Sequence, residues 1–145
     1  MSDSKTAGHA MPPAAPRHRV LVVDDVKLIG RMVRQMLAGE PDVEVHYAQT
    51  PEEALAAATS LRPTVILQDL VMPNVSGAEM VARFRALPET ADVPVIVLSA
   101  VEEPATKADL LAGGASDYLV KLPDKVELAA RVRLHSEGHA RLLER

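Results

Sequence analysis

Short apolar runs alternate with segments of helical periodicity along most of this chain, and this alternation limits the folds open to it. The runs fall at residues 20–23, 43–48, 65–67, 93–98 and 118–120. Four of them are apolar throughout, as strands buried on both faces are, whereas 43–48 alternates like a half-buried edge strand. Helical spacing follows each run. The sequence therefore predicts an α/β fold of five β/α units, with a five-stranded parallel sheet between two layers of helices.

Capping residues mark the boundaries of the predicted helices. A Ser, Thr or Asp followed three residues later by Glu satisfies free backbone N–H groups at a helix start, and Gly commonly ends a helix. We expect helices to begin at Thr50, Ser76 and Asp124, and one helix to end at Gly113-Gly114.

Length and composition exclude several classes of protein. The chain has 145 residues, a formal net charge of -4 and no cysteine. The length suits one domain, and the charge is unlike the basic footprint of a nucleic-acid-binding protein. The lack of cysteine excludes disulfides and fits a reducing cytoplasm. No apolar run approaches the roughly 18 residues of a membrane-spanning helix. We predict a cytoplasmic protein without nucleic-acid or membrane partners.

The two ends of the chain are predicted to lie outside the folded domain. Residues 1–18 are rich in Ala and Pro and lack periodicity, which favours a disordered tail. The folded domain is predicted over 19–135. Residues 136–145 then extend the last helix, as a coiled coil or a linker.

One seam of that last helix has coiled-coil spacing. It consists of Leu128, Val132, His135, His139 and Leu142. The seam predicts pairing with a partner or with a second copy of the chain, and the alternative is a frayed surface helix, which a glycine at 138 favours. The two histidines also have the i,i+4 spacing of metal ligands, but no third ligand accompanies them, which favours solvated histidines.

Polar side chains follow four of the predicted strands, each at the carboxyl end. Asp24 and Asp25 follow the first run, Asp69 the third, Ser99 the fourth and Lys121 the fifth. Each residue alone is typical of a turn, a cap or a solvated charge. Ligands of open α/β sheets bind outside the carboxyl ends of the strands, so the set together indicates one phosphate or metal site.

The charges of this set favour a divalent cation. Three carboxylates and one ammonium carry a net charge of -2, and like carboxylates packed together repel each other. All the ligands are oxygen atoms, which suits Mg²⁺. A carboxylate beside Mg²⁺ and lysine can attack a phosphoryl group and form an acyl phosphate.

These motifs resemble the response-regulator receiver domains over about residues 18 to 135. The resemblance is carried by the acidic end of 20–25, by 65–73 followed by Gly77, by the strand that ends at Ser99, and by 117–121. It implies a flavodoxin-like (βα)5 sandwich with strand order 2-1-3-4-5, which the apolar pattern alone leaves open. It also implies a bacterial, cytoplasmic phosphoprotein of a two-component system or phosphorelay, rather than an enzyme with turnover.

The resemblance also implies roles for individual residues. Asp69 is the phosphoacceptor, and Lys121 pairs with the phosphoryl group. Asp25 binds Mg²⁺ directly, Asp24 binds it through water, and the backbone carbonyl of Val71 completes the protein ligands. The switch residues are Ser99, which moves to a phosphoryl oxygen, and Tyr118, which turns inward.

Partners follow from the same resemblance. A histidine kinase or phosphotransfer protein donates the phosphoryl group, and an effector protein or domain reads the face of helix 4, strand 5 and helix 5. A second copy of the chain binds through that face or through the C-terminal helix. The string Lys121-Leu122-Pro123 with 63–73 is most similar to the receiver half of Wsp-type diguanylate cyclases, so an attached cyclase is an alternative output.

The same string departs from the family pattern. Receivers usually carry Pro directly after the lysine, joined by a cis bond, whereas Leu122 stands between Lys121 and Pro123. A cis bond before a residue other than Pro costs about 2.5–4 kcal/mol. The loop is therefore either reshaped in trans or strained. Separately, Val71 and Val101 place apolar side chains where other receivers carry polar ones, which predicts slow self-dephosphorylation.

Three other interpretations remain open. A phosphatase of the haloacid dehalogenase type also uses an Asp nucleophile with Mg²⁺, but its second Asp two positions on is absent after Asp25. A degenerate interaction module would need an incomplete site. A flavin-binding protein would need a phosphate-binding loop and more aromatic residues than 2%.

Overall fold

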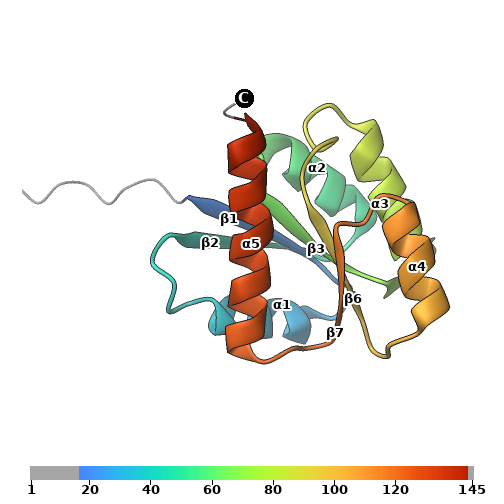
Figure 1. Ribbon diagram of the computed structural model, residues 1–145, viewed down its shortest axis with the longest axis horizontal. Helices are drawn as coiled ribbons and strands as arrows, with labels where there is room; N and C mark the ends of the chain where they lie inside the picture. The colour runs from blue at the N-terminus through green and yellow to red at the C-terminus, as the bar shows by residue number, and fades with distance from the viewer. Residues whose placement is uncertain (1–16, 144–145) are drawn as a thin grey trace, which may run out of the picture.

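The computed structural model describes residues 17–143, which fold into one parallel sheet covered by helices on both faces (Figure 1). The strands are β1 (His18–Val23), β2 (Val43–Ala48), β3 (Val65–Asp69), β4 (Val71–Met72), β5 (Val75–Ser76), β6 (Val95–Ser99) and β7 (Asp117–Val120). The helices are α1 (Lys27–Met36), α2 (Pro51–Leu61), α3 (Gly77–Ala86), α4 (Pro104–Ala112) and α5 (Lys125–Leu143).

The five-stranded sheet has the order β2-β1-β3-β6-β7, with every pair parallel. Because β4 and β5 form a separate two-stranded antiparallel hairpin, β6 and β7 are the fourth and fifth strands of this sheet. The order is therefore the predicted 2-1-3-4-5. The sequence pattern did not reveal this hairpin, since two-residue strands are too short to show periodicity. The prediction that 43–48 is an edge strand is confirmed.

Alternate residues of the central strands face two separate cores. Val20, Val22 and Leu67 face α1 and α5, whereas Leu21 and Ile66 face α2, α3 and α4. All five side chains are fully buried. Since side chains alternate along a strand, a strand buried on both sides must be apolar at every position. Figure 1 shows α1 and α5 together on one face of the sheet.

The predicted caps form at the helix starts. The side-chain oxygens of Thr50, Ser76 and Asp124 each accept a hydrogen bond from the backbone N–H three residues on, at 3.1, 3.1 and 2.9 Å. Helix α4 ends at Gly113, and Gly114 has a φ of 112°, which a residue with a Cβ adopts only under strain.

The ends of the folded part differ from the boundaries drawn from sequence. His18, assigned to the tail, lies in β1 with 2% of its surface exposed. Ser136, assigned to the extension, is 1% exposed within a helix that continues unbroken to Leu143. The rest of the predicted tail, residues 1–16, lies outside the described residues. No helix of the described part is both long and apolar enough to cross a membrane.

The coiled-coil seam predicted for the last helix is largely used inside the chain. Leu128 and Val132 are fully buried in the core that α5 forms with the sheet. His135 is paired with Asp117 of β7, with 3.0 Å between Nε2 and Oδ2. The seam is therefore unavailable to a partner at these three positions, and the solvated state predicted for His135 is wrong. The pattern misled because a helix packed on a sheet shows the same apolar spacing as a coiled coil.

Candidate functional site

Parallel strands bring the predicted polar residues to one edge of the sheet. Asp24 and Asp25 directly follow β1, Asp69 ends β3, Ser99 ends β6, and Lys121 directly follows β7. Because all five strands run in the same direction, their carboxyl ends lie along the same edge, which is where ligands of such sheets bind.

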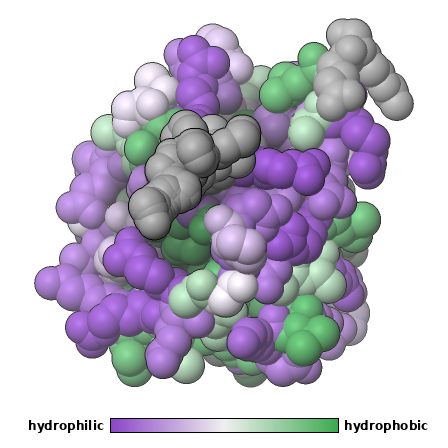
Figure 2. Space-filling model, turned by 90° about the vertical axis from the view of Figure 1, so that its left-hand side faces the viewer, coloured by the Kyte–Doolittle hydropathy of each residue, from purple (hydrophilic) through white to green (hydrophobic). Residues whose placement is uncertain are grey.

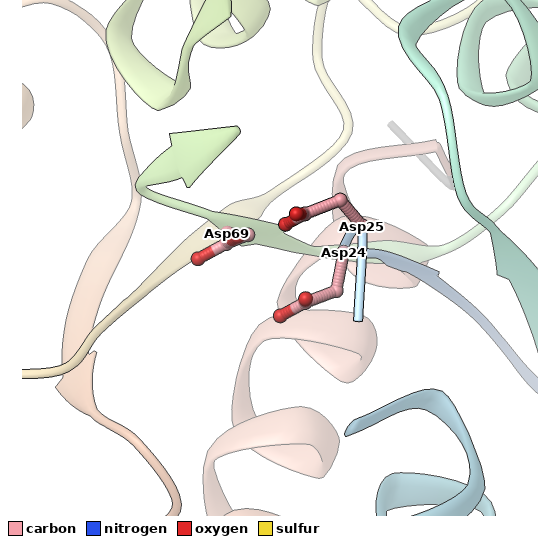
Figure 3. Close-up of side chains that lie close together, drawn as sticks. All are labelled: Asp24, Asp25 and Asp69. Carbon is pink, nitrogen blue, oxygen red and sulfur yellow. The ribbon is translucent and has the colours of Figure 1, made fainter. Parts of the chain in front are cut away.

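Three carboxylates of this edge converge (Figure 3). One oxygen from each of Asp24, Asp25 and Asp69 lies within 4.8 Å of the others. Asp24 and Asp69 are 1% and 4% exposed, whereas Asp25 is only partly buried. Two buried carboxylates with a third beside them form a concentration of negative charge that needs a cation nearby.

Lys121 supplies part of that positive charge. Its Nζ lies 2.8 Å from Oδ1 of Asp69 and 2.9 Å from Oδ2 of Asp24. Burial works to lower the pKa of Lys121, but the hydrogen bonds to the two carboxylates outweigh it and raise the pKa above its ordinary value. Lys121 is therefore a cation that bridges the carboxylates.

Burial disfavours the charged form of Asp69 despite its contact with Lys121. Burial, with a smaller contribution from the charge of Asp24, raises the pKa of Asp69 from 3.8 to about 6, although the hydrogen bond from Lys121 acts in the opposite direction. The charged carboxylate is thus held in surroundings that disfavour it. A further cation at this edge would lower its energy.

Backbone contacts fix the acidic residues in place. Oδ1 of Asp24 accepts a hydrogen bond from the Val26 N–H at 2.8 Å, and the hydroxyl of Tyr47 in β2 donates to the Asp24 carbonyl at 2.6 Å. A Cβ on Gly77 would stand 2.9 Å from the Asp69 carbonyl, so α3 begins close to the end of β3 only because this residue is glycine.

The two predicted switch residues meet at one backbone carbonyl. The Ser99 hydroxyl donates to the carbonyl of Val101 at 2.7 Å, and the Tyr118 hydroxyl donates to the same oxygen at 2.7 Å. Tyr118 is 5% exposed, so its ring already lies inward in this structure while Ser99 is bonded to the loop after β6. Sequence reasoning missed this shared acceptor, because a backbone oxygen leaves no signal in the sequence.

The remaining candidates lie around the site. The side chains of Val71 and Val101 are 75% and 59% exposed. No peptide bond among residues 17–143 is cis, so the loop of Leu122 and Pro123 takes the trans alternative. Within the same residues, the only cluster suited to a metal is that of the three aspartates, and His135 takes no part in it.

Comparison with known proteins agrees with this arrangement. The model of the response regulator receiver domain family matches residues 20–133. The chain belongs to the response regulator receiver domain family, and its role is that of a receiver domain in two-component signalling.

The chain is similar in sequence to several individual response regulators. It is 36% identical over 115 residues to the response regulator PleD of Caulobacter vibrioides, and the matched region covers 79% of this chain and 25% of PleD. It is 38% identical over 121 residues to the KDP operon transcriptional regulatory protein KdpE of Escherichia coli, and the matched region covers 83% of this chain and 52% of KdpE. The chain thus spans about a quarter and about half of these relatives.

A solved structure shows the same fold. The chemotaxis protein CheY4 of Vibrio cholerae has a TM-score of 0.75 and 32% identity to this chain, with 83% of this chain and 98% of that one covered. The predicted flavodoxin-like fold and the resemblance to receiver domains are therefore confirmed.

Proposed function

We propose that Asp69 accepts a phosphoryl group from a histidine kinase or a phosphotransfer protein. The observation that carries the proposal is the position of its carboxylate, buried beside two other aspartates and 2.8 Å from the lysine Nζ. An oxygen of Asp69 attacks phosphorus, the new O–P bond forms, and the bond from phosphorus to the donor breaks. Lys121 then faces the charge that develops on the phosphoryl oxygens.

The donor set fits Mg²⁺. Three carboxylates face one ammonium, and all the ligand atoms are oxygens. Asp24, Asp25, Asp69 and the backbone carbonyl of Val71 would hold the ion. When bound, Mg²⁺ supplies the charge that neutralises the phosphoryl oxygens.

The output side of the proposal uses the contacts at Val101. A phosphoryl group adds about -1.5 to -2 charge and three acceptor oxygens. The Ser99 hydroxyl leaves the Val101 carbonyl for one of these oxygens, and Tyr118 becomes the remaining donor to that carbonyl. The exposed edge of β7 with α4 and α5 then changes its conformation and its partners.

An effector is the partner we propose for this surface. A hollow of about 460 Å³ there is lined by Lys107, Tyr118, Leu122 and Arg131 among others. The effector is either a separate protein, an attached domain such as the diguanylate cyclase that the sequence suggests, or a second copy of the chain.

The exposed valines at 71 and 101 support a long-lived phosphoryl group, since neither side chain can hydrogen-bond an attacking water. A phosphate-release time course should show a lifetime well beyond seconds, and release within seconds would contradict this part of the proposal.

Intact mass spectrometry tests the phosphoacceptor. Incubation with acetyl phosphate and Mg²⁺ should add the mass of one phosphoryl group to the wild type and none to Asp69→Ala. The gain should disappear when a chelator removes Mg²⁺. No gain on the wild type, or an equal gain on the variant, would overturn the proposal.

A further inference from the structure

Gln68 is a polar residue in the core, directly before the proposed phosphoacceptor. It lies in β3 with 0% of its surface exposed. Because side chains alternate along a strand, it shares the face of Ile66, which packs against α2, α3 and α4. A buried primary amide needs several hydrogen bonds to offset its lost contacts with water.

The amide nitrogen of Gln68 has two acceptors, and both belong to the segment that carries the site. Nε2 donates to the backbone carbonyl of Asp69 at 3.0 Å and to Sδ of Met72 at 3.3 Å. The carbonyl ends β3, and Met72 lies in β4, next to Val71. One side chain therefore connects the backbone of the phosphoacceptor to the strand after it.

The amide oxygen of Gln68 has no donor among the described residues. A buried acceptor without a partner is destabilising, and an apolar side chain of similar size would avoid this cost. Turning the amide over would place Oε1 against the Asp69 carbonyl, two acceptors facing each other. The two contacts of Nε2 are therefore what the amide contributes at this position, and local rules are broken in this way chiefly near functional sites.

We propose that Gln68 is a positioning residue for the Mg²⁺ site. It acts through the main chain, by holding the Asp69 carbonyl and Met72 so that the Asp69 carboxylate and the Val71 carbonyl face the same ion. It touches neither the ion nor the phosphoryl group. This inference rests on the proposed function of Asp69.

The test compares Gln68→Met with a matched control, Thr90→Val. Thr90 is also 0% exposed, and its hydroxyl donates to a backbone carbonyl, that of Phe84, at 2.6 Å. Each substitution removes side-chain hydrogen bonding to a buried carbonyl while keeping the volume of the side chain similar. Thr90→Val should unfold at a lower temperature than the wild type. In Gln68→Met, removal of the unpartnered Oε1 offsets part of the cost of the two lost contacts, so its unfolding temperature should fall less. Only Gln68 lies beside the site.

Titration with Mg²⁺ alone, followed by calorimetry or NMR, separates the two roles. We expect about a tenfold loss of Mg²⁺ affinity for Gln68→Met, the size typical of residues that orient metal ligands, and no loss for Thr90→Val. Equal affinities of Gln68→Met and the wild type would overturn the proposal, as would an equal loss in both variants.

A second variant keeps the proposal falsifiable if Gln68→Met does not fold. Met72→Leu removes the sulfur acceptor and leaves the bond to the Asp69 carbonyl, so it should show a smaller loss of Mg²⁺ affinity, and no loss would overturn the proposal in that case. Failure of the function proposed for Asp69 looks different, because the wild type itself would then neither bind Mg²⁺ nor gain a phosphoryl group.

Discussion

The strands of the sheet carry differently paired side chains at their two ends. We call the side where the strands end the carboxyl edge and the side where they begin the amino edge. At the carboxyl edge, three aspartates face one lysine, and the pKa of Asp69 is raised to about 6. At the amino edge, polar groups of β1, of α5 and of the loops before β2 and β3 are largely paired with one another. His18 Nδ1 and Ser136 Oγ are 2.6 Å apart, Ser136 donates to Thr64 at 2.7 Å, and Arg133 binds Glu40 and Asp42 at 2.7 and 2.8 Å.

This difference separates the site at which we propose phosphoryl transfer from a set of contacts that hold the fold together. The carboxyl edge keeps like charges together, and an added cation would stabilise it further. The amino edge satisfies most of its groups and fixes α5 against β1 and β3. The side of the molecule shown in Figure 2 is mostly hydrophilic, with scattered hydrophobic residues.

The largest effect should follow loss of the bridging lysine. Lys121→Met removes the cation nearest to Asp69, so the rate of phosphorylation by acetyl phosphate should fall about 100-fold, as it does when one preorganised electrostatic group is removed from an active site. The rate of mass gain measures this. The control Lys125→Met removes the same charge from an exposed position and should leave the rate unchanged. Equal rates in both variants would contradict the role of Lys121.

A smaller effect, a gain in stability, should follow loss of the charge of Asp69, the proposed phosphoacceptor. The folded pKa of Asp69 lies above its ordinary 3.8, so the penalty of its charge is present above pH 6 and disappears as pH falls toward 4. Asp69→Asn should therefore raise the free energy of unfolding at pH 7.5 without Mg²⁺ by about 1–2 kcal/mol.

Urea unfolding measures that difference. The exposed carboxylate of Asp109 on α4 provides the control, and Asp109→Asn should change the free energy of unfolding by less than about 0.5 kcal/mol. A loss of stability in Asp69→Asn would show that the carboxyl edge is balanced without a cation.

A substitution at the amino edge should lower the stability of the fold and leave the phosphorylation rate unchanged. Ser136→Ala removes the hydroxyl between His18 and Thr64, so the free energy of unfolding should fall by about 1–2 kcal/mol, with the phosphorylation rate unchanged. The exposed hydroxyl of Thr59, which donates to the Leu55 carbonyl at 3.0 Å, gives a control, since Thr59→Ala should cost much less. Slower phosphorylation of Ser136→Ala would show that the amino edge affects the reaction at the carboxyl edge, which would contradict the separate roles that we assign to them.

The smallest expected effect is the loss of stability at low pH when the ion pair between Asp42 and Arg133 is broken. The hydrogen bond from Arg133 lowers the pKa of Asp42 from 3.8 to about 2. Its contribution is complete above pH 4 and is lost as pH falls toward 2. Because the pair is partly exposed, we expect about 1 kcal/mol or less. Wild type and Asp42→Asn should therefore converge in stability over this range, and a constant difference between them would contradict the ion pair.

Much of the fold and the centre of the site could be predicted from the sequence. Strands buried on both faces are apolar throughout, so 20–23 and 65–67 were recognisable, and the parallel sheet then placed Asp69 beside Asp24. What the pattern could not show is long-range pairing. Nothing local indicates that Ser136 meets His18 across the sheet, that Leu128 packs on the chain itself, or that Tyr118 and Ser99 share one carbonyl.

The most direct measurement locates the phosphoryl group on the chain. After incubation with acetyl phosphate and Mg²⁺, reduction of the acyl phosphate and fragment mass spectrometry should find the modification on Asp69, and hydroxylamine should remove the added mass from the unreduced protein. A modification on Asp24, Asp25 or a histidine, or one that resists hydroxylamine, would contradict the account.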